Sequence, residues 1–208
     1  MDFFLSIIAR FTGNDKRAIA TDRRMCYNGP TKEVPSMILH TPRLTLRPVT
    51  LADLSSTYAY AGDLENTRFM MFLPDEDEAE TAMHLVQAEE QWRMAAPERY
   101  EFAVCLEGKH IGGVTLYMQE DCTEAELGWV LHRDYWRQGY ITEAANAVIE
   151  LARSMGVKRI FACCDSENAA SYRTMLKLGM QLCRDDGVRT NRSMGEEQRV
   201  EWTCERYL

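Results

Sequence analysis

The chain lacks most of the patterns that mark metal, nucleotide or membrane binding. It contains no CxxC pair, no GxGxxG or Walker turn and no repeat. It also contains no uncharged apolar stretch of membrane-spanning length; the apolar stretch Phe3–Ala9 near the N-terminus is too short. The seven cysteines are an odd number without metal-ligand spacing, and the four histidines show no such spacing either. We therefore expect reduced thiols in a cytoplasmic protein, no metal site and no membrane partner.

The chain also lacks an excess of basic residues. It has 24 Lys and Arg against 32 Asp and Glu, a net charge of −8, and its basic residues form no stripe, so we expect no nucleic-acid partner. The 208 residues suffice for one domain with a buried core. We expect that domain at 41–208, after an N-terminal extension, 1–40, whose structure the sequence does not specify. The chain is expected to be a monomer or a homodimer.

Hydrophobic periodicity predicts alternating strands and helices. Strands are expected at 44–49, 102–106, 111–118, 124–131, 159–164, 180–184 and 198–207. Helices are expected at 51–60, 78–94, about 140–155 and 168–178. The strand, helix and strand from 124 to 164 form a crossover unit, so the strands 124–131 and 159–164 should be parallel neighbours.

The turn Tyr135–Gly139 precedes the most strongly amphipathic helix of the chain. A helix that begins at a glycine-containing turn presents unpaired backbone N–H groups and the positive end of its dipole, which suit a pyrophosphate. Gly139 would allow close approach of the backbone to phosphate. From Gly139 alone, an ordinary strand-to-helix turn is the favoured interpretation.

A second segment, 165–180, begins a helix directly after the second parallel strand. The side chain of Asn168 can cap this helix or donate a hydrogen bond to a ligand amide lying between the two parallel strands. Taken alone, the segment leaves both roles open.

Four segments together resemble the GNAT superfamily of N-acetyltransferases, in the branch of the ribosomal-protein N-terminal acetyltransferases (RimJ/RimL-like). They are TPRLTLRPVT (41–50), ELGWVL (126–131), YWRQGYITEA (135–144) and ENAASYRTMLKLGM (167–180). The resemblance covers about four-fifths of the chain.

The resemblance implies an α/β (α+β) fold. The expected architecture is a mixed, twisted sheet of about six or seven strands, flanked by about four helices and splayed between the fourth and fifth strands. It also implies acetyl-CoA as co-substrate, with the pantetheine arm between 126–131 and 160–164. The implied cofactor-binding residues are Trp129, Val130, Leu131, Arg137, Gln138, Gly139, Tyr140, Ile141, Thr142 and Asn168.

The chain departs from the family pattern at three positions. Arg137 and Ile141 stand where family members often have Gly and Ala. Met175 stands seven residues after Asn168, where many members carry a tyrosine acid, whereas Ser171 matches the serine of the ribosomal-acetyltransferase branch. Ser171 is therefore the expected proton donor to the CoA sulfur, although the same position suits a surface serine of a helix.

The catalytic residues expected are Glu126 and Ser171. Glu126 is the candidate base, since it shares a strand face with Gly128, whose missing side chain would leave room for substrate; a solvated carboxylate is the alternative. Cys164 is expected to be a buried thiol without a catalytic role. Tyr172 is expected to face the core with Met175 and Leu176.

The function expected is transfer of an acetyl group to an amine in a ternary complex. The acceptor is a protein N-terminal α-amine or a small-molecule amine, bound between the first two helices (51–94) and the final hairpin. The alternative is an acyl-CoA-binding module of the same fold that has lost turnover. The acidic run 75–80 could favour a basic acceptor, but charge runs are more often solvated surface.

Overall fold

The structure, a computed structural model, describes residues 37–208, so most of the expected extension 1–40 lies outside the described residues. Eight strands of the described region form one sheet in the order β1-β2-β3-β4-β5-β6-β8-β7. The strands are β1 (Leu39–His40), β2 (Leu44–Pro48), β3 (Arg99–Leu106), β4 (Lys109–Met118), β5 (Glu124–Leu131), β6 (Arg159–Asp165), β7 (Gln181–Thr190) and β8 (Gln198–Tyr207).

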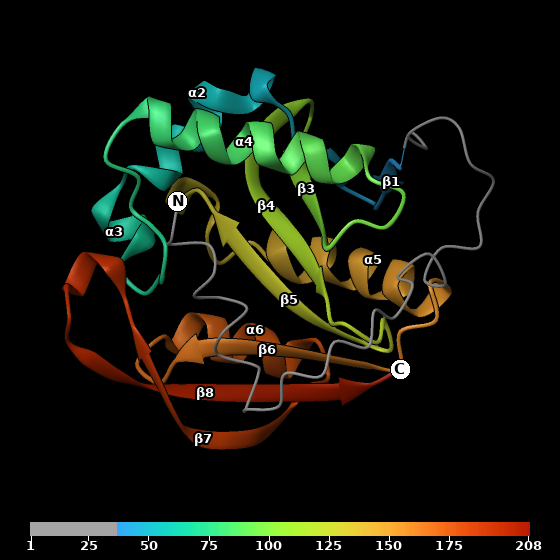
Figure 1. The fold of residues 1–208 in the computed structure, drawn as a ribbon, viewed down its shortest axis with the longest axis vertical. Helices are drawn as coiled ribbons and strands as arrows, with labels where there is room; N and C mark the ends of the chain where they lie inside the picture. Colours follow the sequence, from blue (N-terminus) through green and yellow to red (C-terminus); the bar gives the residue numbers. More distant parts are fainter. Residues whose placement is uncertain (1–36) are drawn as a thin grey trace, which may run out of the picture.

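Helices cover both faces of the sheet (Figure 1). The α-helices are α2 (Leu54–Ala61), α3 (Leu64–Thr67), α4 (Glu78–Arg93), α5 (Tyr140–Ser154) and α6 (Ala169–Lys177). α2 and α4 lie against β3 and β4 on one face, while α5 and α6 pack on the other face, against β2, β4, β5 and β6. Asp77 accepts a hydrogen bond from the backbone N–H of Glu80 at 2.9 Å and so caps α4.

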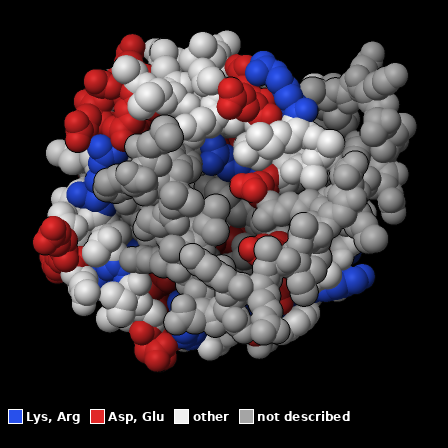
Figure 2. Space-filling view, in the orientation of Figure 1, with Lys and Arg blue, Asp and Glu red and all other residues white. Residues whose placement is uncertain are grey.

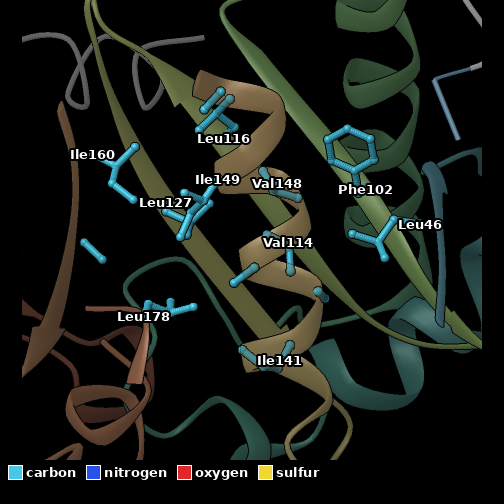
Figure 3. Packing of buried hydrophobic residues seen from close by; sticks show 14 of the residues in the cluster. Leu46, Phe102, Val114, Leu116, Leu127, Ile141, Val148, Ile149, Ile160 and Leu178 are labelled. Carbon is cyan, nitrogen blue, oxygen red and sulfur yellow. The ribbon is translucent and has the colours of Figure 1, made fainter. Parts of the chain in front are cut away.

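The main core lies between the sheet and the pair α5 and α6. Val148 and Ile149 of α5 pack with Val114, Leu127 and Ile160 of three adjacent strands, all of them almost fully buried (Figure 3). A smaller apolar cluster lies under α4 on the opposite face, where Leu85 packs on Ala103 and Cys105. For this reason β3 is buried on both faces.

The expected α/β architecture is confirmed, with differences at its edges. The eighth strand is the short β1, which pairs with β2, and β7 extends to Thr190, beyond the expected end at 184. The additional helix α3 lies in a segment without clear periodicity. On α6, Met175 is buried in the core as expected, but the expectation that Leu176 also faces the core is wrong. Leu176 is 47% exposed, because it lies one residue, about 100°, around the helix from Met175, and Leu178, directly after the helix, is buried instead.

The feature that positions the site is the divergence of two parallel strands. β5 pairs with β6 only at Glu124↔Arg159, Ala125↔Ile160 and Glu126↔Phe161. Beyond these pairs both strands continue without pairing with one another, and Figure 1 shows them separating toward their C-terminal ends. The expected splay between the fourth and fifth predicted strands is thus present, and it begins after Glu126.

Five of the described cysteines are free, namely Cys105, Cys163, Cys164, Cys183 and Cys204. The expectation of reduced thiols is wrong at Cys122, which is disulfide-bonded and lies in the turn between β4 and β5, where neither sequence spacing nor a neighbouring cysteine indicates a bridge. Within residues 37–208, every helix is too short or too polar to traverse a lipid bilayer.

The two leucines at the end of α6 give a matched test of the core. Leu178→Ala is expected to lower the free energy of unfolding by about 2–5 kcal/mol, because Leu178 is 1% exposed and its loss leaves a cavity. Leu176→Ala, two residues away, should change it by no more than about 0.5 kcal/mol. Urea unfolding of the two variants measures the difference, and equal losses would contradict this packing.

Candidate functional site

The turn before α5 is strained where the sequence departs from glycine. Arg137 has φ of +61° and Gly139 has φ of +81°, both in the left-handed region. For Arg137 this conformation costs about 1–2 kcal/mol, which explains why a glycine suits the position. Arg137, Gln138 and Gly139 are all exposed. The turn is therefore held open to solvent at the positive end of the α5 dipole.

The first turn of α5 offers backbone donors. Intrahelical bonding begins at Glu143, whose N–H donates to the carbonyl of Gly139, so the N–H groups of Tyr140, Ile141 and Thr142 have no partner within the helix. The side chain of Ile141 is buried in the core and faces away from the turn. Any contact of Ile141 with an anion would therefore use its backbone, and its size relative to alanine does not crowd the turn.

Arg43 fastens this turn to the edge of β2, a role that the sequence alone does not reveal. Its Nε donates to Glu143 at 2.7 Å and its Nη1 donates to the carbonyl of Gln138 at 3.0 Å, while its guanidinium lies 4.4 Å from the centre of the Tyr140 ring. Thr41 donates to Glu143 at 2.6 Å. Two segments about a hundred residues apart thus hold the turn in position.

The open edge of β5 lies beside the turn. The side chains of Trp129 and Leu131 point toward the core beneath α5, and the side chain of Val130 points to the opposite face of the sheet. The indole Nε1 of Trp136 donates to the carbonyl of Leu131 at 2.7 Å and joins the turn to the end of the strand. A ligand that paired with this edge would therefore use the backbone of these residues more than their side chains.

The start of α6 brings together two predicted residues. Asn168 is the N-cap, and its Oδ1 accepts from the backbone N–H of Ser171 at 3.1 Å. The cap leaves the Nδ2 donor of Asn168 free of this bond, so capping and ligand binding are compatible roles. Ser171 is partly exposed on the first turn, whereas Met175 is fully buried. Tyr172 lies against the ring of Trp202, with 4.9 Å between centroids.

Glu126 lies where β5 leaves β6, on the face opposite α5 and α6. It is paired with Tyr117 of β4 and with Phe161 of β6. Burial raises the pKa of Glu126 to about 7; the negative charge of Glu201 acts in the same direction, and the positive charge of Arg189 partly opposes it. A carboxylate with this pKa exchanges a proton near neutral pH.

The space above Gly128 differs from the sequence expectation. A Cβ at Gly128 would lie 3.3 Å from Cε2 of Tyr117, so the ring of Tyr117 covers this glycine. The room expected there for substrate is thus partly filled by Tyr117, a residue that the sequence analysis did not single out. Tyr117 is itself 39% exposed and borders the site.

A pocket of about 410 Å³ lies between α3, the start of α6 and the β7–β8 connection. It is lined by Leu64, Arg68, Glu167, Ser193, Met194, Glu197 and Arg199. Among the residues that the structure describes, no group of three or more His, Cys, Asp or Glu side chains could hold a metal ion.

The acidic run 75–80 is engaged mainly by structural contacts. Asp75 is buried and accepts a hydrogen bond from Thr81, while Glu76 and Glu80 pair with Arg192 of the final hairpin at 3.2 and 2.5 Å. The remaining acidic side chains are exposed, and Figure 2 shows acidic side chains gathered at the upper left, near the start of α4. The run therefore ties α4 to the hairpin.

Comparison with protein families gives a match over most of the described chain. A family described as the acetyltransferase (GNAT) domain matches residues 43–181. An uncharacterised N-acetyltransferase of Bacillus subtilis, YnaD, is 31% identical over 150 residues, which are 70% of this chain and 83% of that protein.

Solved structures share the same fold. The ribosomal L7/L12 α-N-protein acetyltransferase RimL, solved with coenzyme A, has a TM-score of 0.73 at 13% identity and covers 82% of this chain and 98% of its own. The microcin C7 self-immunity acetyltransferase MccE, solved with acetyl-CoA and AMP, also has a TM-score of 0.73, at 18% identity, over 84% of this chain and 97% of its own.

The raised pKa of Glu126 predicts a pH-dependent effect on stability. The fold favours the neutral carboxyl, so its contribution to stability is present below about pH 4.3 and is lost as the pH rises toward 7. Glu126→Gln cannot ionise, and its stability relative to the wild type should rise by on the order of 2 kcal/mol between pH 5 and pH 8.

Urea unfolding at the two pH values measures this change. Glu120→Gln, which removes an exposed carboxylate from the turn between β4 and β5, is the matched control and should show little change. A stability difference for Glu126→Gln that is the same at both pH values would contradict the raised pKa.

Proposed function

The chain belongs to the GNAT family of acetyltransferases, and from this premise we propose that it transfers the acetyl group of acetyl-CoA directly to an amine in a ternary complex. The observation that carries the proposal is the end of pairing between β5 and β6 after Glu126↔Phe161. The acceptor proposed is a protein N-terminal α-amine or a small-molecule amine, and the reaction is placed in the cytoplasm.

The described residues fit acetyl-CoA at two places. The edge of β5 from Leu127 to Leu131 does not pair with β6 and could pair with an extended amide-containing arm, and the N–H groups of Tyr140–Thr142 suit a pyrophosphate. Arg137 would add a cation beside the phosphates, and Asn168 an amide donor beside the arm. When bound, acetyl-CoA supplies the thioester carbonyl that the amine attacks.

Glu126 would take the proton from the attacking amine. A base is most effective when its pKa is close to the working pH, and the pKa of Glu126, about 7, meets this condition. An α-amine with a pKa near 8 is about one-tenth neutral at pH 7, whereas a lysine side chain is neutral in about four of every 10,000 molecules. An α-amine therefore makes the smaller demand on this base.

Ser171 would supply a proton to the departing sulfur. It lies on the first turn of α6, fixed by the bond between its N–H and Asn168. The buried Met175 has no proton to give, so the first turn of the helix is the place where an acid can act. The pocket between α3 and the β7–β8 connection, which Glu167 lines next to Asn168, would be the approach for the acceptor.

Release of free thiol from acetyl-CoA tests the proposal with a panel of peptides and small amines. Wild-type kcat/KM is expected to rise with pH through about 7 as Glu126 ionises. Glu126→Gln should lower kcat about 10²–10⁴-fold and abolish the rise of kcat/KM with pH. Ser171→Ala should lower kcat by up to a similar factor, and by less where a water molecule replaces the hydroxyl. Tight binding of acetyl-CoA without thiol release for any amine would instead indicate an acyl-CoA-binding module.

The contacts of Arg43 with Glu143 and Gln138 predict a separate effect, on the binding of acetyl-CoA. Glu143→Gln weakens the contact with Arg43 that fixes Gln138 and Tyr140, so the KM for acetyl-CoA should rise several-fold while kcat stays near the wild-type value. Glu150→Gln, an exposed carboxylate on the same helix, is the control. Equal KM values for the two variants would show that the contact between Arg43 and Glu143 does not position the turn.

A further inference from the structure

A row of polar side chains crosses the sheet from Glu126 toward α4. Arg99 of β3 is paired with Tyr117 of β4, which is paired with Glu126 of β5, so the three side chains share the face opposite α5. Adjacent strands lie about 4.8 Å apart, which places Arg99 roughly 10 Å from Glu126 across the sheet. Both residues therefore lie on the same face of the sheet.

A second carboxylate lies beside Arg99. Oε1 of Glu101 lies 2.7 Å from Nε2 of His84 on α4, and its Oε2 lies 3.8 Å from Nε of Arg99, too far for a hydrogen bond. Burial alone would raise the pKa of Glu101, but the charge and hydrogen bond of His84 hold it below its usual range. Glu101 is thus ionised and held mainly by His84.

The guanidinium of Arg99 has two donors without partners. Its Nε and Nη2 are buried in a side chain that is 15% exposed, and neither makes a hydrogen bond with any described residue; the same holds for Oε2 of the neighbouring Glu101. These two nitrogens form one edge of the guanidinium and donate in parallel, which is the geometry that binds a carboxylate with two hydrogen bonds. Unpaired buried donors are costly, so their retention points to a ligand.

The charge of the cluster favours an anion. Burial alone would lower the pKa of His84, but Glu101 raises it, so the protonated imidazole is favoured beside the carboxylate. His84 and Arg99 then carry two positive charges; Glu101 is the carboxylate beside both of them, and Asp75 acts on His84 more weakly. The group that pairs with Arg99 should therefore be negative.

We propose that Arg99 binds a carboxylate of the acceptor while the reacting amine lies at Glu126. The backbones of Arg99 and Glu126 are roughly 10 Å apart across the sheet, and an extended peptide, at about 3.3 Å per residue, covers this span with about three residues. The acceptor class inferred is a peptide whose carboxylate lies about three residues from its free α-amine. The inference rests on the proposed function for the identity of the amine site, whereas the carboxylate site can be measured on its own.

The test compares the binding of trialanine with that of its C-terminal amide, because the two peptides differ only in the carboxylate. Calorimetry of each peptide with protein saturated with CoA should show about tenfold or tighter binding of the free acid, the range expected for a charge-assisted double hydrogen bond. Arg99→Gln should remove this preference by weakening the acid alone, and Arg99→Lys should retain part of it. The KM for acetyl-CoA should be unchanged in both variants.

Arg153→Gln, an exposed arginine in the last turn of α5, is the matched control and should keep the preference. Thermal unfolding of the Arg99 variants shows that they fold. Equal affinity of the wild type for acid and amide, no binding of either peptide, or an unchanged preference in Arg99→Gln would overturn the carboxylate site. A binding preference without thiol release would support this site and count against the proposed function, and thiol release without a preference would do the reverse.

Discussion

The site depends on one constraint, the end of hydrogen-bonded pairing between β5 and β6 after Glu126↔Phe161. Up to that pair, the two strands are held by the core beneath α5 and α6, in which Ala125 and Ile160 are buried. Beyond it, β5 presents an unpaired backbone edge and β6 leads into the cap at Asn168. β5 is thus paired with β4 as far as Leu131, but with β6 only as far as Glu126.

The two faces of the sheet differ in polarity. The face toward α5 and α6 is apolar and provides most of the buried core (Figure 3). The face toward α4 carries Arg99, Glu101 and Glu126, whose partial burial costs stability. Ionising Glu126 in the folded protein is unfavourable, as its pKa of about 7 indicates, but the same burial gives it the proton affinity that a base needs at neutral pH. The buried charges on this face therefore lower stability, and the proposed role of Glu126 as a base would depend on the same burial.

Most of the fold could be predicted from the sequence, because periodicity and capping act locally: the α5 pattern, the Asn168 cap and the alternation along 124–131 all appear in the structure. Contacts between distant segments could not be predicted. Arg43 reaches Gln138 and Glu143, Tyr117 covers Gly128, and His84 bonds Glu101, and each contact depends on strand register and helix placement rather than on spacing. The catalytic roles of Glu126 and Ser171 stay predictions.

Hydrogen exchange of the backbone amides, measured with and without CoA, tests the central claim most directly. If the unpaired edge of β5 and the turn before α5 bind acetyl-CoA, CoA should slow exchange at amides within 127–131 and at Tyr140–Thr142. Exchange in strands remote from the divergence, such as β7, should be unchanged. Binding of CoA without added protection at either segment would contradict the account, because the divergence of β5 and β6 would then not be the donor site.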